Sequence, residues 1–124
     1  MGRGNRYTGG SGETAAVEFL KKKGYRIRQT NFRTPFGEID IVADLGPSLV
    51  FVEVKTRITY SLGPPYLSVT RLKQKHIVKN ALYYLVRHNL SDSPWRVDVV
   101  SVKLDCEYRI ENIELIENVV EDNG

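Results

Sequence analysis

Two carboxylates and a lysine recur at short spacing in the middle of the chain. Asp40 precedes Glu53 with twelve residues between them, and Lys55 follows Glu53 after one residue. The surrounding segments, EIDIVA and LVFVEVKTR, are rich in β-branched and aromatic residues, which is typical of buried strands. Because side chains two residues apart on a strand point to the same side, Glu53 and Lys55 are expected to share a face. The pattern predicts a charged site on two buried strands.

A Gly-Pro turn at residues 46–47 joins the two segments, so we expect an antiparallel hairpin. A register symmetric about that turn places Asp40 opposite Glu53, with Cβ atoms about 4.5–5.5 Å apart. The same register places Glu38 opposite Lys55, where an ion pair is expected. Two facing carboxylates are destabilising, and an apolar surround increases the cost. The pair formed by Asp40 and Glu53 therefore requires an explanation.

Three arrangements would relieve the repulsion between Asp40 and Glu53. One carboxylate holds a proton, the register slips, or a divalent cation lies between them. Mg²⁺ favours one or two carboxylates together with waters and phosphates, and Mn²⁺ is a second candidate. Such an ion would polarise a phosphoryl oxygen and activate water, while Lys55 positions that water or offsets phosphate charge. The set suits phosphodiester hydrolysis; the alternative is a surface ion-pair ladder on a half-exposed strand.

The remaining sequence predicts the elements that hold these residues. A short helix is expected from Ser11 or Gly12 to the lysines before Gly24, and a longer one spans about 69–89. In the longer helix, the residues expected to face the core are Leu72, Leu82, Leu85 and Val86. Strands are expected at residues 25–34, 38–43, 48–57, 95–105 and 108–119, the last at a sheet edge. The order αβββαββ indicates an α/β fold with a central mixed sheet flanked by helices.

Length and composition indicate one globular domain. The chain has 124 residues, of which 41% are hydrophobic and 27% charged. Residues 1–10 are expected to form a flexible basic arm, residues 11–118 a single domain, and residues 119–124 a frayed acidic tail. Apolar runs fall short of the roughly 18 residues that span a bilayer. These short runs predict no membrane partner. The single cysteine, Cys106, permits no internal disulfide, which fits a reducing compartment, and we therefore expect a cytoplasmic protein.

Charge is distributed unevenly along the chain. The net charge is +3, but residues 105–124 carry seven acids and one base, so residues 1–104 hold 17 bases and eight acids. A basic body is typical of a protein with a polyanionic partner, and a solvated surface without one is the alternative. Arg33, Arg57 and Lys73 are the candidate nucleic-acid contacts. Arg96 and Asp98 are expected to form a structural ion pair.

The segments GEIDIVA and LVFVEVKTR carry a resemblance to a known family, together with GSGETAAVEFLKKKGYRIRQTNFRT before them and RVDVVSV after them. They closely resemble the YraN-like family, an uncharacterised bacterial family, over about residues 9–104. The resemblance implies a restriction-endonuclease-like fold within the PD-(D/E)xK nuclease superfamily, in which Asp40, Glu53 and Lys55 match the motif. The similar archaeal Holliday junction resolvases carry a further acid on the first helix, where Glu13 stands here. The superfamily motif usually has proline before its first acid, whereas Ile39 precedes Asp40.

Three functions remain open. The first is a Mg²⁺- or Mn²⁺-dependent DNA endonuclease, with branched or single-strand-containing DNA as candidate substrate. Asp40, Glu53 and Glu13 would bind metal, and Lys55 would position or activate the attacking water. Because cutting a junction needs two symmetric sites, this function also predicts a homodimer. The second is a non-catalytic nucleic-acid-binding module of the same fold with a vestigial site. The third is a protein-interaction scaffold that uses the acidic tail and the edge strand.

Overall fold

The computed structural model of the chain describes residues 9–58 and 71–120, without the side chains of residues 9–11 and 71–74. Most of the predicted basic arm and acidic tail therefore lies outside the described residues. In the described part, helices and strands follow the predicted order αβββαββ, and no helix is long and apolar enough to cross a membrane. The elements are α1 (Gly9–Lys22), β1 (Arg26–Thr34), β2 (Gly37–Leu45), β3 (Ser48–Ile58), α2 (Arg71–Arg87), β4 (Trp95–Leu104) and β5 (Ile110–Ile116).

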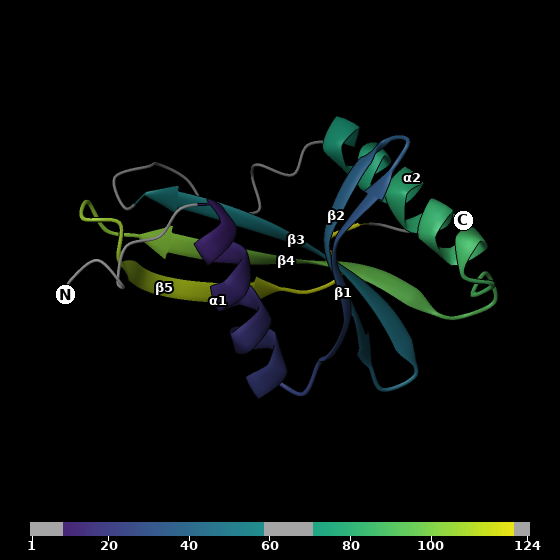
Figure 1. The fold of residues 1–124 in the computed structure, drawn as a ribbon, viewed down its shortest axis with the longest axis horizontal. Coiled ribbons are helices and arrows are strands. Elements are labelled where there is room, and N and C mark those ends of the chain that lie inside the picture. Colours follow the sequence, from purple (N-terminus) through teal and green to yellow (C-terminus); the bar gives the residue numbers. More distant parts are fainter. Residues whose placement is uncertain (1–8, 59–70, 121–124) are drawn as a thin grey trace.

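The strands form one mixed sheet in the order β1-β2-β3-β4-β5. β3 and β4 pair in parallel, whereas the other neighbouring strands pair antiparallel. A parallel pair needs a crossover connection, and α2 lies in the segment between β3 and β4. Figure 1 shows that β1 and β2 run steeply across the direction of β3, β4 and β5, so the sheet is strongly twisted. The predicted α/β arrangement with an edge strand at β5 is confirmed.

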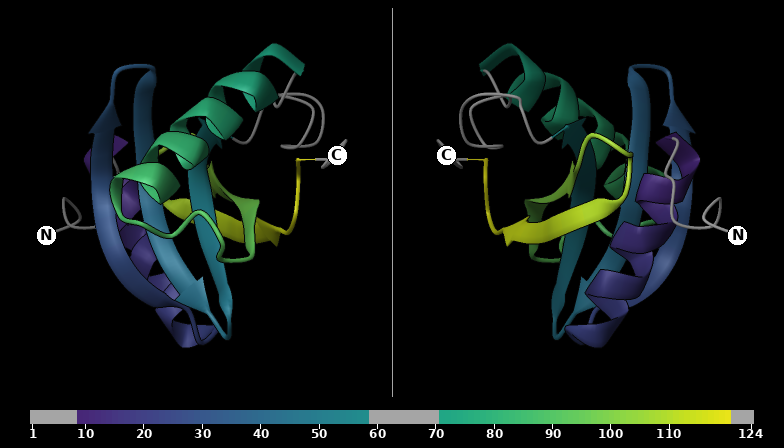
Figure 2. Two further views of the ribbon diagram at one scale, coloured as in Figure 1. Left: turned by 90° about the vertical axis from the view of Figure 1, so that its right-hand side faces the viewer. Right: turned by 90° about the vertical axis from the view of Figure 1, so that its left-hand side faces the viewer.

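The two helices cover opposite faces of the sheet (Figure 2). On one face, α1 packs the fully buried side chains of Ala16 and Leu20 into a cluster with Val50 and Val52 of β3. On the other face, α2 packs against a second cluster that includes Phe51. The first half of β3 is therefore buried on both sides, as its run of apolar residues predicts.

The predicted register of the β2–β3 hairpin is confirmed from the turn outwards. Leu45 pairs with Ser48, and the pairing continues as far as Ile41 with Val52. Gly46 has a φ of +58°, which suits the first central position of a tight hairpin turn. Beyond Ile41 the two strands are no longer paired, because β2 follows β1 away from β3.

The ladder ends before Asp40 and Glu53, so the predicted pairing of these two residues across the hairpin does not form. The next predicted pair fails as well. Glu38 does not form an ion pair with Lys55; the ammonium group of Lys55 lies 3.5 Å from the carboxylate of Glu53 instead. Glu38 is paired along the other edge of β2, with Arg33 of β1. A symmetric register extends the hairpin past the point where the twist separates its strands, and this is the physical reason for the error.

The buried face of α2 also differs from the prediction. Leu85 is buried, but Leu82 and Val86 are 47% and 67% exposed. The side chain of Leu72 lies outside the described part. Ala81 and Tyr84 join Leu85 in the core, where the ring of Tyr84 contacts the rings of Phe32 and Phe51. Two apolar stripes therefore exist on α2, and only one of them is covered within the described residues.

A buried polar network closes the face of the sheet that α1 covers. Asp98 is fully buried and forms the predicted ion pair with Arg96 at 3.1 Å. Its carboxylate also accepts hydrogen bonds from the hydroxyl of Tyr25 and from the backbone N–H of Asn118, each at 2.8 Å. The network therefore connects the segment after α1, the start of β4 and the chain beyond β5. Burial and the hydrogen bond with Asp98 raise the pKa of Tyr25 to about 12.

Candidate functional site

Asp40 lies at a break in the pairing of β1 with β2. Paired residues flank Asp40 and Asn31 on both sides, but these two are not paired with each other. Asn31 has a φ of +54°, a left-handed conformation that asparagine tolerates better than most residues. Ile39 and Val42 both face the core under α2, so the alternation of side chains is also broken at Asp40.

The carboxylate of Asp40 is bound to the backbone of β3. Its Oδ2 atom accepts a hydrogen bond from the N–H of Val54 at 2.8 Å. Val54 is the residue between Glu53 and Lys55, so this bond holds Asp40 beside both of them. Burial raises the pKa of Asp40, and the hydrogen bond from Val54 opposes that rise. The charge of Glu38 raises the pKa further, while that of Lys55 lowers it, and the net result lies above the ordinary value.

Lys55 connects the two predicted carboxylates electrostatically. Its Nζ atom lies 3.5 Å from Oε2 of Glu53, and both side chains are about one quarter exposed. The two residues share a face of β3, as their spacing predicts. The same ammonium group is close enough to Asp40 to lower the pKa of its carboxyl group. The structure therefore brings Asp40, Glu53 and Lys55 into one connected set.

Glu13 of α1 lies close enough to Asp40 for the charge of Asp40 to act on its carboxyl group. Burial is the main cause that raises the pKa of Glu13, and the charge of Asp40 raises it further. A hydrogen bond with the side chain of Asn31 opposes the rise, and the charge of Glu38 adds to it. The first helix therefore brings an acid into the electrostatic field of Asp40.

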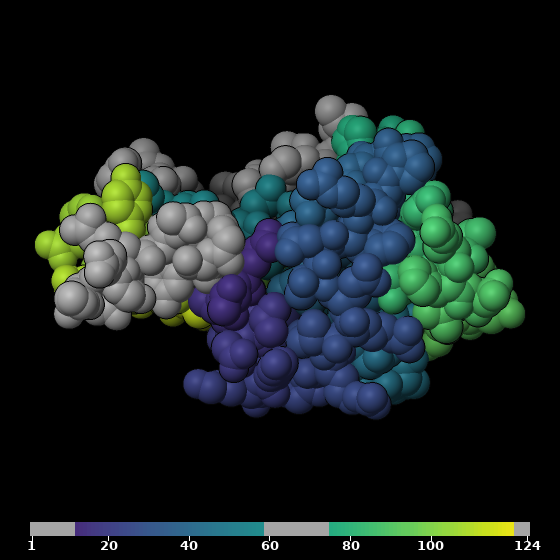
Figure 3. All heavy atoms as spheres, in the orientation of Figure 1, coloured from purple at the N-terminus to yellow at the C-terminus, as the bar shows by residue number. Residues whose placement is uncertain are grey.

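A close approach of α1 to β3 makes this placement possible. Gly12 is buried, and a Cβ atom added to it would lie 2.8 Å from Oγ1 of Thr56. Because only glycine lacks a Cβ, no other residue fits here without movement. Figure 3 shows α1 and the β1–β2 hairpin side by side on this face of the molecule.

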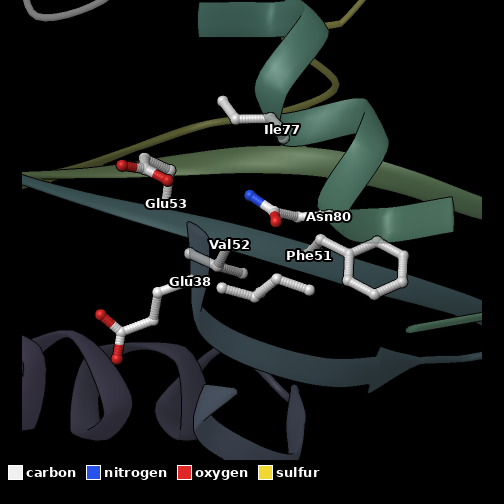
Figure 4. A pocket seen from close by; sticks show the side chains of 7 residues that line it. Glu38, Phe51, Val52, Glu53, Ile77 and Asn80 are labelled. Carbon is white, nitrogen blue, oxygen red and sulfur yellow. The ribbon is translucent and has the colours of Figure 1, made fainter. Parts of the chain in front are cut away.

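A small pocket opens next to the charged residues, on the side of the sheet that α2 covers. Its lining includes Glu38, Glu53 and Phe51 of the sheet and Asn80 of α2. Figure 4 shows both carboxylates toward one end of the pocket and the ring of Phe51 toward the other. Asn80 is buried and accepts a hydrogen bond from the hydroxyl of Thr34. The pocket therefore combines a charged end with an apolar end.

Two residues of this region were not among the predicted site residues. Glu38 was expected only as an ion-pair partner, yet it acts electrostatically on both Asp40 and Glu13. Its position two residues before Asp40 on the same strand is the sequence signal that would have included it. Asn80 gives a weaker signal, as a polar residue on the apolar stripe of α2 that also contains Tyr84.

The three predicted nucleic-acid contacts are spread over different elements. Arg33 is exposed on β1, near the tip of the β1–β2 hairpin. Arg57 is half-buried near the end of β3, where it pairs in register with Lys103 of β4. Lys73 belongs to the first turn of α2, but its side chain lies outside the described part. The described residues therefore do not bring these three side chains together.

The donor set of the site suits a hard divalent cation. Residues 9–58 and 71–120 contain no group of three or more His, Cys, Asp or Glu side chains that could hold a metal, so Glu13, Asp40 and Glu53 do not form a ready-made cage. Mg²⁺ needs only one or two protein carboxylates, because waters and substrate phosphates complete its shell. The hydrogen bond from Val54 reaches Oδ2 of Asp40 and not Oδ1, so it engages one of the two carboxylate oxygens.

Fold and site together define an α/β protein with a carboxylate–lysine site where two strands of a mixed sheet separate. The sequence comparisons agree with the predicted resemblance: residues 12–102 match the family described as "Uncharacterised protein family UPF0102". The chain belongs to this YraN-like family. It is 50% identical to the UPF0102 protein of Pelobacter propionicus, over 94% of this chain and 84% of that relative. It is 44% identical to the UPF0102 protein of Caldicellulosiruptor saccharolyticus, over 91% and 96% of the two chains.

Proposed function

We propose that this protein is a metal-dependent endonuclease of the restriction-endonuclease-like class, which hydrolyses phosphodiester bonds in DNA. One observation carries the proposal. The Asp40 carboxylate is hydrogen-bonded to Val54, the residue between Glu53 and Lys55, so the acid, acid and lysine of the nuclease motif are held together. A mixed sheet with helices on both faces is the architecture that this class requires.

Asp40 and Glu53 would hold a Mg²⁺ or Mn²⁺ ion, and Glu13 would be a further ligand. When bound, the ion would polarise a phosphoryl oxygen and lower the pKa of a water ligand. The bond from Val54 fixes the orientation of the Asp40 carboxylate, so the carboxylate needs little reorganisation to bind a cation. Lys55 provides a positive charge at the same place, where it would offset phosphate charge or orient the attacking water.

The direct test is cleavage by the purified protein. Labelled four-way junction, flap, duplex and single-stranded DNA are incubated with Mg²⁺ or Mn²⁺, and the products are separated by size. We expect cleavage of at least one substrate by the wild type and none by Asp40→Asn, which keeps an oxygen for the Val54 N–H. The proposal is wrong if every substrate stays intact, or if the variant cuts as fast as the wild type. Cleavage of junctions in particular would require a homodimer with two symmetric sites.

A second function is a nucleic-acid-binding module of the same fold with a vestigial site. The observation that favours it is the charge of α2, whose sequence has five lysines and arginines and no acidic residue, because such a helix can bind phosphates without a metal. Salt-sensitive binding of DNA that chelator does not change, without cleavage under either metal, would support this alternative and exclude the first.

A further inference from the structure

An exposed surface of aromatic, apolar and basic side chains lies next to the candidate site. We call it the tip surface, because it joins the tip of the β1–β2 hairpin to the outer side of α2. It comprises Phe36, Lys79, Leu82, Tyr83, Val86 and Arg87. Its large apolar members Phe36, Leu82 and Val86 are 49%, 47% and 67% exposed. Such an apolar area, rimmed by charges, is typical of a binding surface.

The ring of Phe36 is exposed but held in place. Its backbone N–H donates a hydrogen bond to Oγ1 of Thr34 at 2.9 Å, which fixes the hairpin tip. The Phe36 ring meets Tyr83 of α2 in a T-shaped contact with 6.4 Å between centroids. Lys79 places its ammonium group over the Phe36 ring, 5.6 Å from the centroid. An aromatic ring that is both fixed and half exposed provides a stacking partner with little loss of side-chain entropy.

The surroundings of Phe36 favour a polyanion. Helix α2 contains five basic residues and no acidic residue in its sequence, RLKQKHIVKNALYYLVR. Lys79 and Arg87 belong to the tip surface itself, since a guanidinium nitrogen of Arg87 donates to the hydroxyl of Tyr83 at 3.1 Å. Arg33 is exposed on the adjoining strand. Aromatic rings interleaved with cations are the usual means of binding single-stranded nucleic acid, because bases stack and phosphates meet the charges.

The combination selects an unpaired nucleotide rather than a duplex. Within a double helix each base is stacked on its neighbours, so a fixed ring such as Phe36 has access only to bases that are unpaired or at an end. The tip surface also adjoins the pocket: Thr34 connects the hairpin tip to Asn80, and Asn80 lines the pocket together with Glu53.

We propose that the tip surface binds an unpaired nucleotide of the nucleic acid, with the base stacked on Phe36 and the flanking phosphates at Lys79 and Arg87. The inference shares one element with the proposed function, which is that the partner is a nucleic acid. It requires neither a metal nor cleavage. It adds that the substrate contains a single-stranded portion, such as a flap or the unpaired nucleotides at a branch.

The test compares two single strands of equal length in the presence of EDTA. One carries bases, and the other carries abasic sites at the same phosphates. We expect the wild type to bind the base-bearing strand about tenfold more tightly, the difference expected for one stacked base. Phe36→Ala should lose this preference, whereas Phe36→Trp should keep it. Tyr108→Ala is the matched control, since Tyr108 is a 46% exposed aromatic residue in the distant turn between β4 and β5.

The outcomes separate this inference from the proposed function. Equal affinity of the wild type for both strands, no binding of either strand, or an unchanged preference in Phe36→Ala would overturn the inference. If the protein cleaves DNA with metal but Phe36→Ala keeps the preference for the base-bearing strand, the inference is wrong and the endonuclease proposal is not affected. A preference that depends on Phe36, without cleavage of any DNA under Mg²⁺ or Mn²⁺, would support the inference and overturn the endonuclease. Circular dichroism of each variant checks that the fold is kept.

Discussion

The Oδ2 atom of Asp40 accepts a hydrogen bond from the backbone N–H of Val54 at 2.8 Å, across the point where β2 and β3 separate. The ladder of backbone hydrogen bonds between the strands ends at Ile41 and Val52. Beyond it, the side chain of Asp40 accepts the hydrogen bond of the Val54 N–H in place of a backbone carbonyl. The arrangement satisfies a half-buried N–H, which would otherwise be costly. It also keeps a carboxylate with a raised pKa beside Lys55, where a cation would stabilise the ionised form.

The first prediction concerns pH and Asp40. Burial is the main cause that raises its pKa above the ordinary value of 3.8. The folded protein therefore retains the Asp40 proton at pH values where the unfolded chain has released it. The contribution of Asp40 to the free energy of unfolding is full below its ordinary pKa, and is lost as pH rises through the raised pKa. The side chain of Asp40→Asn does not ionise, so the variant does not lose this contribution. Its free energy of unfolding should therefore rise relative to that of the wild type as pH increases from 3.8 through the raised pKa of Asp40.

Urea unfolding of both proteins from about pH 3 to about pH 7 checks this prediction, without metal and with EDTA. The charge of Asp40 also raises the pKa of Glu13, so the difference between the two proteins reports the titration of Asp40 together with its effect on Glu13. A stability difference that is constant with pH, or that changes in favour of the wild type, would contradict the raised pKa.

The second prediction concerns the binding of a divalent cation. Mn²⁺ titrated into the wild type by calorimetry should give saturable binding, and Glu53→Gln should weaken it by about tenfold or more, because a neutral amide is a poorer ligand for a hard cation. Glu114→Gln is the control, since Glu114 is an exposed acid on the edge strand β5. Heats that are equally small for all three proteins would return Asp40 and Glu53 to a structural role.

The third prediction concerns Tyr25 and its hydrogen bond to Asp98. The pKa of Tyr25 is raised to about 12, so the folded state favours the protonated phenol. Its contribution to stability is full below the ordinary pKa of 10 and is lost as pH rises toward 12. At neutral pH, Tyr25→Phe should cost about 1.5–3 kcal/mol, the range for a hydrogen bond to a charged group.

Urea unfolding at neutral and alkaline pH measures both effects. The wild type should lose more stability than Tyr25→Phe between about pH 9 and about pH 11, which narrows the difference between them. Alkaline titration of tyrosinate absorbance should show one late-titrating group in the wild type that is missing from the variant. The prediction fails if the two proteins lose stability in parallel.

The fourth prediction concerns the contact between Gly12 and Thr56. Gly12→Ala places a Cβ 2.8 Å from Oγ1 of Thr56, so α1 or the threonine must move. Alanine is otherwise the better helix former by about 1 kcal/mol, and a net loss of stability would therefore report the clash. The double variant Gly12→Ala/Thr56→Ala lacks the threonine hydroxyl, so it should regain the stability that Gly12→Ala loses.

The four proteins form a double-mutant cycle, for which thermal unfolding supplies the free energies. We expect a coupling of about 0.5–3 kcal/mol, as found for residues in direct contact. Additive effects would show that α1 does not approach β3 at this glycine. If Glu13 is a metal ligand, Gly12→Ala should also weaken Mn²⁺ binding, because it displaces the helix that carries Glu13.

The sequence predicts the local part of the site well. The register of β2 and β3 follows from the turn at Gly46, and the shared face of Glu53 and Lys55 follows from strand periodicity. Both are properties of residues close together in the chain. The family resemblance contributed Glu13, which periodicity alone would have left as an ordinary helix acid.

The errors arise where distant segments decide the outcome. Lys55 pairs with Glu53 and not with Glu38, because β2 remains paired with β1 beyond the point where its pairing with β3 ends. On α2, Leu82 and Val86 are as apolar as the residues that the sheet covers, so residue type alone does not exclude them from the core. Only the position of the aromatic residues of β1 and β3 determines that Tyr84 is inside.

The network around Asp98 has a consequence for how the protein can be shortened or fused. Asn118 donates its backbone N–H to Asp98 at 2.8 Å, and Val119 donates to the carbonyl of Val97 at the same distance. A chain cut before Asn118 would deprive a fully buried carboxylate of one donor. Affinity tags and reporter domains therefore belong after residue 120, and the shortest stable version of the domain should end beyond the last regular strand.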